Sequence, residues 1–136
     1  MKHFTLKEAN NLLPQIKLIV DEIKEKRESL YEAIEKYEIQ TEHKEDILET
    51  MYLKTIIKST NEEINELIEI IENFGVLVKG LDPFLVDFPC EHNGESVLLC
   101  WKEGEEKISY WHKMHEGFRG RKPISELNIK NENLIP

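Results

Sequence analysis

The segment YWHKMHEGFRGRKP, residues 110–123, contains the side chains with the clearest potential for chemistry. His112 and His115 are three positions apart, and three cations occupy the four positions from Arg119 to Lys122. Imidazoles are common metal ligands, while arginines beside glycines suit the binding of an anion. The segment could therefore form a metal site, an anion-binding loop, or a solvated turn that follows a strand.

A metal site would need a third ligand beside the two histidines, because catalytic zinc keeps three protein ligands and one open position. The candidates for that third ligand are Cys90, Asp87, His92 and Glu116. Residues three apart in a continuing strand point to opposite faces, so His112 and His115 converge only if a turn begins at His112. A lone histidine among apolar neighbours is more often a hydrogen-bonded core residue. We therefore predict no metal and no cofactor; His112 and His115 are the residues expected to ligate a metal if one bound.

An anion site would use the planar guanidinium groups of Arg119 and Arg121 to hold a phosphate or carboxylate. The neighbouring glycines, Gly117 and Gly120, would permit positive φ and close approach of the backbone. In that case a ligand site would combine Asp87 as acid or base, His112 as proton carrier, and Arg119 and Arg121 as clamps. The structural alternative is a solvated turn whose arginines pair with acidic helices.

Cysteine chemistry is a poorer match to the sequence. A nucleophilic thiolate needs a stabilising base nearby, whereas Cys100 is expected opposite Asp87, whose carboxylate disfavours a thiolate. Cys90 is expected to pack in the core. The sequence contains no P-loop, dinucleotide fingerprint, nucleophile elbow or zinc-protease motif. It therefore favours a non-catalytic protein over an enzyme and leaves both open.

Composition limits the class of protein and its partners. A chain of 136 residues, with 40% hydrophobic and 33% charged residues, suits one globular domain, 1–136. The net charge of -9 repels phosphate backbones, so we expect no nucleic-acid partner. Neither a membrane-spanning run nor the apolar core of a signal peptide is evident, and two cysteines are too few for a disulfide framework. We expect a cytoplasmic protein that does not engage a membrane.

A helical hairpin is predicted over about residues 5–74. Thr5 and Glu8 have capping-box spacing at its start, and Pro14 is expected to disturb the first helix. Apolar residues then recur in alternating steps of three and four from Leu13 to Tyr37, interrupted by Arg27, which either packs its stem at the edge or meets a buried acid or ligand. A second such stripe runs over residues 53–74, and the polar stretch EIQTEHKED between them predicts a turn.

An antiparallel sheet is predicted over about residues 76–112, followed by a loop and tail over 113–136. Asn93-Gly94 and Gly104-Glu105 are read as two-residue hairpin turns. The first turn pairs Asp87 with Cys100, and the second pairs Val97 with His112, which places His112 on the face toward the helices and Trp111 on a half-polar face. The fold class is thus α+β, a long antiparallel helical hairpin packed on a small three- to four-stranded antiparallel sheet.

Four segments together resemble a known family. They are FTLKEANNLLP (4–14), GVLVKGLDPFLVDFP (75–89), VLLCWKEGEEKISYWH (97–112) and GFRGRKPI (117–124). In order and content they are similar to the signature segments of the uncharacterised bacterial domain of unknown function 2203 family. The resemblance implies no particular activity, substrate or cofactor. The family pattern has an acidic residue three positions after WH, where this chain has His115, so a His112–His115 metal pair would be peculiar to this chain.

Two classes of function follow from these observations. The first is a non-catalytic binding or adaptor protein that self-associates as a homodimer or holds a protein partner, with Leu85, Leu98 and Trp111 as exposed anchors. The alternative is a binding protein or enzyme for an anionic small molecule, with its site around the loop at 112–122. The sequence favours the first class, because no complete catalytic constellation can be assembled from it.

Overall fold

The computed structural model describes residues 2–43 and 46–127, which form an α+β fold of two long helices and an antiparallel sheet. The chain divides into two compact units. Among the described residues, one unit, the sheet unit, comprises residues 2–17 and 71–127, and the other, the helical unit, comprises residues 18–43 and 46–70. The expectation of a single domain stays a prediction, and the predicted tail beyond residue 127 lies outside the described residues.

Helix α1 (Leu6–His43) begins with the predicted capping box. The Thr5 amide donates to the Glu8 carboxylate at 2.9 Å, and the Glu8 amide donates to Thr5 Oγ1 at 3.0 Å. The expectation that Pro14 disturbs this helix is wrong, because α1 runs through it without a break. Leu13 and Ile16 are almost fully buried on either side of Pro14, and their packing outweighs the hydrogen bond that proline cannot make.

The helical unit buries both predicted apolar stripes. In α1 the residues Val20, Ile23, Arg27 and Leu30 are buried, and in α2 (Ile47–Glu72) the buried positions include Leu53, Thr60 and Ile64. Asp46 caps α2, since its carboxylate accepts a hydrogen bond from the Glu49 amide at 3.1 Å. The predicted turn between the helices is shorter than expected, because α1 continues as far as His43. Regular 3.5-residue spacing therefore predicted the helical packing correctly.

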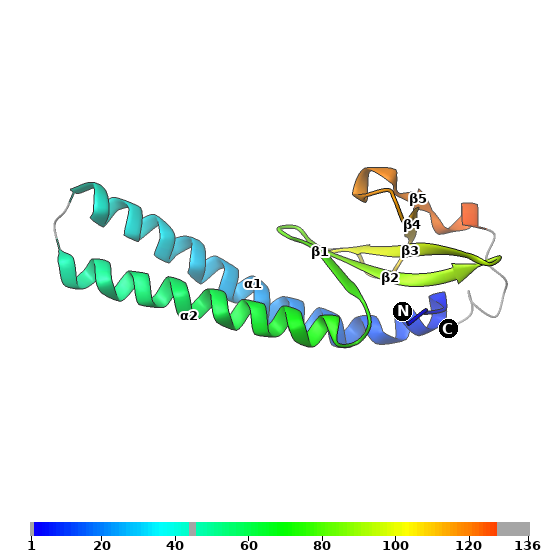
Figure 1. The fold of residues 1–136 in the computed structure, drawn as a ribbon, viewed down its shortest axis with the longest axis horizontal. Helices are drawn as coiled ribbons and strands as arrows, with labels where there is room; N and C mark the ends of the chain where they lie inside the picture. Colours follow the sequence, from blue (N-terminus) through cyan, green and yellow to red (C-terminus); the bar gives the residue numbers. More distant parts are fainter. Residues whose placement is uncertain (1, 44–45, 128–136) are drawn as a thin grey trace. The chain divides into compact units, whose positions relative to one another are not determined.

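In the described part of the chain, the sheet has five antiparallel strands in the order β1-β2-β3-β4-β5, one or two more than predicted (Figure 1). The strands are β1 (Leu77–Leu81), β2 (Phe84–His92), β3 (Glu95–Lys102), β4 (Tyr110–Lys113) and the short β5 (Lys122–Pro123). Two 3₁₀ turns complete the unit: η1 (Phe118–Gly120) joins β4 to β5, and η2 (Ile124–Leu127) follows β5. Each strand is thus the sheet neighbour of the strand before it in the sequence.

The first turns of α1 lie against one face of this sheet. The rings of Phe4 and Phe88 meet edge to face with centroids 5.5 Å apart. The Phe4 amide donates to the Pro89 carbonyl at 2.7 Å, and the Ile108 amide donates to Asn10 Oδ1 at 2.9 Å. Pro89 lies two residues beyond the last β1 pair, Leu77 with Asp87, so its missing N–H costs no hydrogen bond to β1.

The register of β2 against β3 is as predicted. Asn93 and Gly94 both have positive φ, 51° and 79°, as a two-residue type I′ turn requires. His92 therefore pairs with Glu95, and Asp87 pairs with Cys100. The backbone preference of the Asn-Gly dipeptide is local, which explains why the sequence predicts this register correctly.

The predicted register of β3 against β4 is wrong by one residue. Leu98, not Val97, pairs with His112, and Leu99 pairs with Trp111. Gly104 and Glu105 do not close a two-residue hairpin, because the Glu105 carboxylate accepts a hydrogen bond from the Lys102 amide at 2.7 Å and from Arg121. These hydrogen bonds stabilise a connection between β3 and β4 that is longer than a two-residue turn.

A shift of one residue exchanges the two faces of a strand. His112 and Tyr110 therefore share the face of Asp87 and Cys100, and Trp111 shares the face of Leu99 that packs toward α1. The predicted exposed anchors are also wrong, since Leu98 is 1% exposed, Trp111 is 8% exposed and Leu85 is half-buried. Among the described residues, no helix is long and apolar enough to cross a membrane.

The burial of Leu98 can be tested by comparing two leucines. Leu98→Ala should lower the free energy of unfolding by about 2–5 kcal/mol, because it leaves a cavity in a fully packed site. Leu18→Ala should change it by less than about 0.5 kcal/mol, because Leu18 is 73% exposed. Urea denaturation followed by circular dichroism measures both values. Equal values for the two variants would contradict the burial of Leu98.

Candidate functional site

Three side chains of different chemistry converge on the sheet face opposite α1. Asp87 comes from β2, Cys100 from the facing position of β3, and His112 from β4. The three residues are buried, and their potential ligand atoms all lie within 4.8 Å of one another. Strands β2 and β4 flank β3 at about 4.8 Å on each side. The side chains of Asp87 and His112 therefore meet across β3, where the small Cys100 leaves room for them.

Both ring nitrogens of His112 have partners. Nδ1 lies 2.9 Å from the Lys113 carbonyl oxygen, which can only accept, so Nδ1 is the donor. Nε2 lies 3.2 Å from Asp87 Oδ1. The hydrogen bond to Asp87, followed by that to Cys100, raises the pKa of His112 to about 10, although burial acts in the opposite direction. Asp87 and His112 thus form a buried ion pair when Nε2 carries a proton.

A cavity of about 260 Å³ opens onto this cluster. Asp87, Cys100 and His112 line it together with Lys79, Leu85, Glu116, Gly117 and Phe118. The last three residues belong to the segment between β4 and β5, so this segment forms one wall of the cavity. The arrangement offers a ligand two carboxylates, an imidazole, a thiol and a cation beside two apolar side chains.

Glu116 holds that wall in place. Its carboxylate accepts hydrogen bonds from the Lys113 amide and from Lys122 Nζ, each at 2.9 Å. The bond to Lys122, followed by that to Lys113, lowers the pKa of Glu116 to about 2. A Cβ atom on Gly120 would lie 2.8 Å from Cβ of Glu116. Of the two expected roles of Gly120, close approach of the backbone is therefore confirmed, whereas its φ is not positive.

Arg121 is occupied by other residues of the protein. Its Nη2 donates to both carboxylate oxygens of Glu105 at 2.7 Å, and its guanidinium carbon lies 4.1 Å from the centroid of the Tyr110 ring and 4.8 Å from that of Phe118. These contacts tie the connection after β3 to the segment after η1. Arg121 therefore fixes the wall of the cavity. The structural alternative predicted an acidic helix as the partner of the arginines, whereas the partner of Arg121 is Glu105, in the connection after β3.

The structure brings together two of the four predicted ligand residues, Asp87 and His112. Arg119 and His115 are exposed. Among the residues that the structure describes, the group suited to a metal is Asp87, Cys100 and His112, and His115 is not part of it. Of the third ligands considered from the sequence, Asp87 is the one that lies beside His112.

Cys100 is the site residue that sequence reasoning missed. Its position opposite Asp87 was predicted, but the error in the next register placed His112 on the other face. A signal was present, because the predicted register exposed the large apolar Trp111 and buried His112, whereas the reverse assignment buries the more apolar ring. A register chosen to bury Trp111, instead of one chosen to fit a Gly104-Glu105 turn, would place Asp87, Cys100 and His112 on the same face.

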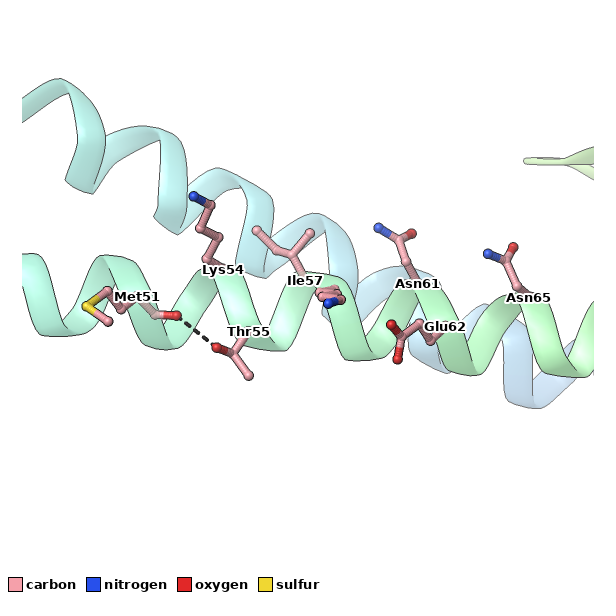
Figure 2. A pocket seen from close by; sticks show the side chains of 8 residues that line it. Met51, Lys54, Thr55, Ile57, Asn61, Glu62 and Asn65 are labelled. Atoms are coloured by element: carbon pink, nitrogen blue, oxygen red, sulfur yellow. Dashed lines mark hydrogen bonds between the residues drawn. The ribbon is translucent and has the colours of Figure 1, made fainter.

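A second hollow lies along α2 and has a different character. It is lined by residues of this one helix, among them Met51, Thr55, Asn61 and Glu62 (Figure 2). Thr55 is engaged in its own helix, where Oγ1 donates to the Met51 carbonyl at 3.1 Å. This is an open helix surface and not a convergent set of reactive groups, so it suits contact with another helix better than chemistry.

A family model described as an uncharacterized conserved protein (DUF2203) matches residues 2–124, and the chain belongs to this family. The match includes all residues that line the cavity at Asp87, Cys100 and His112. No curated protein and no solved structure matches the chain.

The two glycines of the cavity wall should differ in their tolerance of a methyl group. Gly120→Ala should destabilise the protein by about 1–3 kcal/mol, because the added Cβ displaces Glu116 and breaks its hydrogen bonds. Gly117→Ala should be within about 0.5 kcal/mol of the wild type, because its φ is -105° and the added Cβ meets nothing within 4 Å. Denaturant midpoints measure the difference. The proposed role of Glu116 would be wrong if both variants were equally stable.

Proposed function

We propose that this protein binds a small polar molecule in the cavity above Asp87, Cys100 and His112. The observation that carries the proposal is the convergence of a buried acid, imidazole and thiol, from three adjacent strands, on one cavity. Replacing a buried ion pair with apolar residues of similar volume is often neutral or stabilising, so stability alone does not account for the buried pair of Asp87 and His112. Such clusters in clefts are therefore candidates for functional sites.

The lining of the cavity indicates the class of ligand. Lys79 and a protonated His112 would attract an anionic group, while Asp87 and Glu116 would accept hydrogen bonds from it or repel a second charge. The volume of about 260 Å³ is below the range of about 300–1,000 Å³ typical of larger ligands. The best match is a small metabolite with a carboxylate or phosphate and at least one hydroxyl or amino group. If the ligand is a substrate, His112 supplies a proton donor and Asp87 orients it.

A thermal-shift screen of carboxylate and phosphorylated metabolites, followed by calorimetric titration of each hit, tests this proposal. We expect a ligand that raises the melting temperature of the wild type, and whose affinity falls at least tenfold in Asp87→Asn and Lys79→Ala. Cys90→Ala is the matched control, because Cys90 pairs with Val97 on the opposite face of the sheet and should leave affinity unchanged.

Two results would count against this site. One is that no compound shifts the melting temperature. The other is that affinity survives in Asp87→Asn and Lys79→Ala but is lost in Arg119→Ala, which would place the ligand on the exposed arginine outside the cavity.

Self-association is a second candidate function, and the surface of α2 favours it. Along this helix the exposed residues Lys54, Lys58, Glu62 and Glu66 follow one another at intervals of four. A second copy of this chain, packed antiparallel, would place Lys58 beside the Glu62 of the other copy and Lys54 beside its Glu66. The charges therefore match reciprocally, as a twofold homodimer requires.

A charge-swap series tests the homodimer. Light scattering after size-exclusion chromatography should give the mass of a dimer for the wild type. Lys58→Glu and Glu62→Lys should each shift the mass toward that of a monomer, because each places like charges together. The double variant K58E/E62K should restore the dimer, since it exchanges the signs. A wild type that stays monomeric at the highest concentration used would rule this interface out.

We also propose a cytoplasmic location. Both cysteines are free thiols, and they lie on opposite faces of the sheet. A reducing compartment is consistent with this state.

A further inference from the structure

We propose that Asp87, Cys100 and His112 are the three protein ligands of a divalent transition metal, with zinc as the best match. This inference rests on the proposed function, because the metal would lie at the base of the same cavity and would help to hold the ligand. It goes further by naming a cofactor and by giving Cys100 a role that ligand binding alone does not require.

The spacing of the three side chains suits one tetrahedral ion. Bonds of about 2.0–2.3 Å to zinc place neighbouring ligand atoms about 3.3–3.8 Å apart. His112 Nε2 and Asp87 Oδ1 are already 3.2 Å apart, and all three ligand atoms lie within 4.8 Å of one another. Small side-chain rotations therefore bring the set to ligand distances without a change in the strands.

The surroundings of His112 are those of a metal-binding imidazole. Nδ1 donates to the Lys113 carbonyl at 2.9 Å, which fixes the ring and leaves Nε2 beside Asp87 Oδ1 and within 4.8 Å of Cys100 Sγ. Ligating histidines nearly always donate their other ring N–H to a carbonyl or carboxylate in this way. On binding, the metal replaces the proton on Nε2 and the thiol proton of Cys100, and both protons pass to solvent.

The donor set selects the metal. One sulfur, one nitrogen and one oxygen ligand favour zinc, or cobalt as its substitute, over magnesium and calcium, which prefer oxygen alone. Three protein ligands leave the fourth position open, which is typical of catalytic and not structural zinc sites. That position faces the cavity lined by Lys79 and Glu116. A small anionic or hydroxyl-bearing ligand could therefore complete the coordination.

Titration of the full-length, untagged, reduced and metal-free protein with cobalt(II) tests the site. A thiolate ligand gives a charge-transfer absorption in the near ultraviolet, and tetrahedral coordination gives intense visible bands. We expect one equivalent of cobalt to produce both signals, and one equivalent of zinc to remove them by displacement.

The two cysteines supply a matched pair of variants. Cys100→Ser should lose the charge-transfer band, whereas Cys90→Ser, on the opposite face, should keep it. Asp87→Asn preserves shape and should weaken cobalt binding by roughly tenfold or more while it keeps the band. Asp87→Asn also decides the matter if Cys100→Ser fails to fold by circular dichroism. No charge-transfer band in the wild type, a band that persists in Cys100→Ser, or unchanged affinity in Asp87→Asn would overturn the proposal.

The experiments distinguish a failure of the metal-site proposal from a failure of the ligand-binding proposal. If the metal-free protein binds a small molecule through Asp87 and Lys79 while cobalt gives no band, this inference falls and the proposed function stands. If cobalt binds through Cys100 while no small molecule binds with or without zinc, the metal site stands and the proposed function falls.

Discussion

The contact between His112 Nε2 and Asp87 Oδ1 spans the width of a strand, and much of the sheet unit is arranged so that it can form. β2 and β4 are not neighbours, so their side chains meet only by leaning over β3. The β3 residue over which these side chains meet must be small, as Cys100 is. A leucine at that position would fill the space that the imidazole and carboxylate now share, while a glycine would leave the pair above a void. The size of Cys100 is thus as important as its thiol.

The same contact depends on a register that distant residues maintain. Glu105 bonds the Lys102 amide at the end of β3 and pairs with Arg121, sixteen positions further along the chain. Arg121 in turn lies over the rings of Tyr110 and Phe118, one in β4 and one in the cavity wall. The Glu105–Arg121 ion pair therefore links two segments. One is the connection after β3, which sets the register of His112, and the other is the segment between β4 and β5, which covers His112. A loss of the Glu105–Arg121 pair would affect the site directly, because Arg121 Nη2 also donates to the Cys100 carbonyl at 3.4 Å.

This dependence explains which features were predictable from the sequence. The helical stripes and the Asn93-Gly94 hairpin arise from neighbours in the chain, so local patterns predict them correctly. Thr5 and Glu8 satisfy each other three residues apart, for the same reason. The β3–β4 register is different, because Glu105 takes part in a pair with Arg121 that no local window contains. Gly104-Glu105 resembles a tight turn when the sequence is read locally, without its distant partner Arg121. An error of one residue in the predicted β3–β4 register placed His112 on the face opposite to Asp87, so the sequence did not predict the cluster.

The two cysteines have different environments because they lie on opposite faces of the sheet. Cys90 and Cys100 are both buried free thiols, and the β2–β3 register sends them to opposite sides of the sheet. Burial, with a smaller contribution from Glu91, raises the pKa of Cys90 to about 11, so it behaves as a core side chain in the layer that meets α1. Cys100 instead lies beside an imidazole and lines a cavity. Thiol chemistry in this protein, whether toward a metal or toward a ligand, therefore belongs to one face of the sheet, and the other face is reserved for packing.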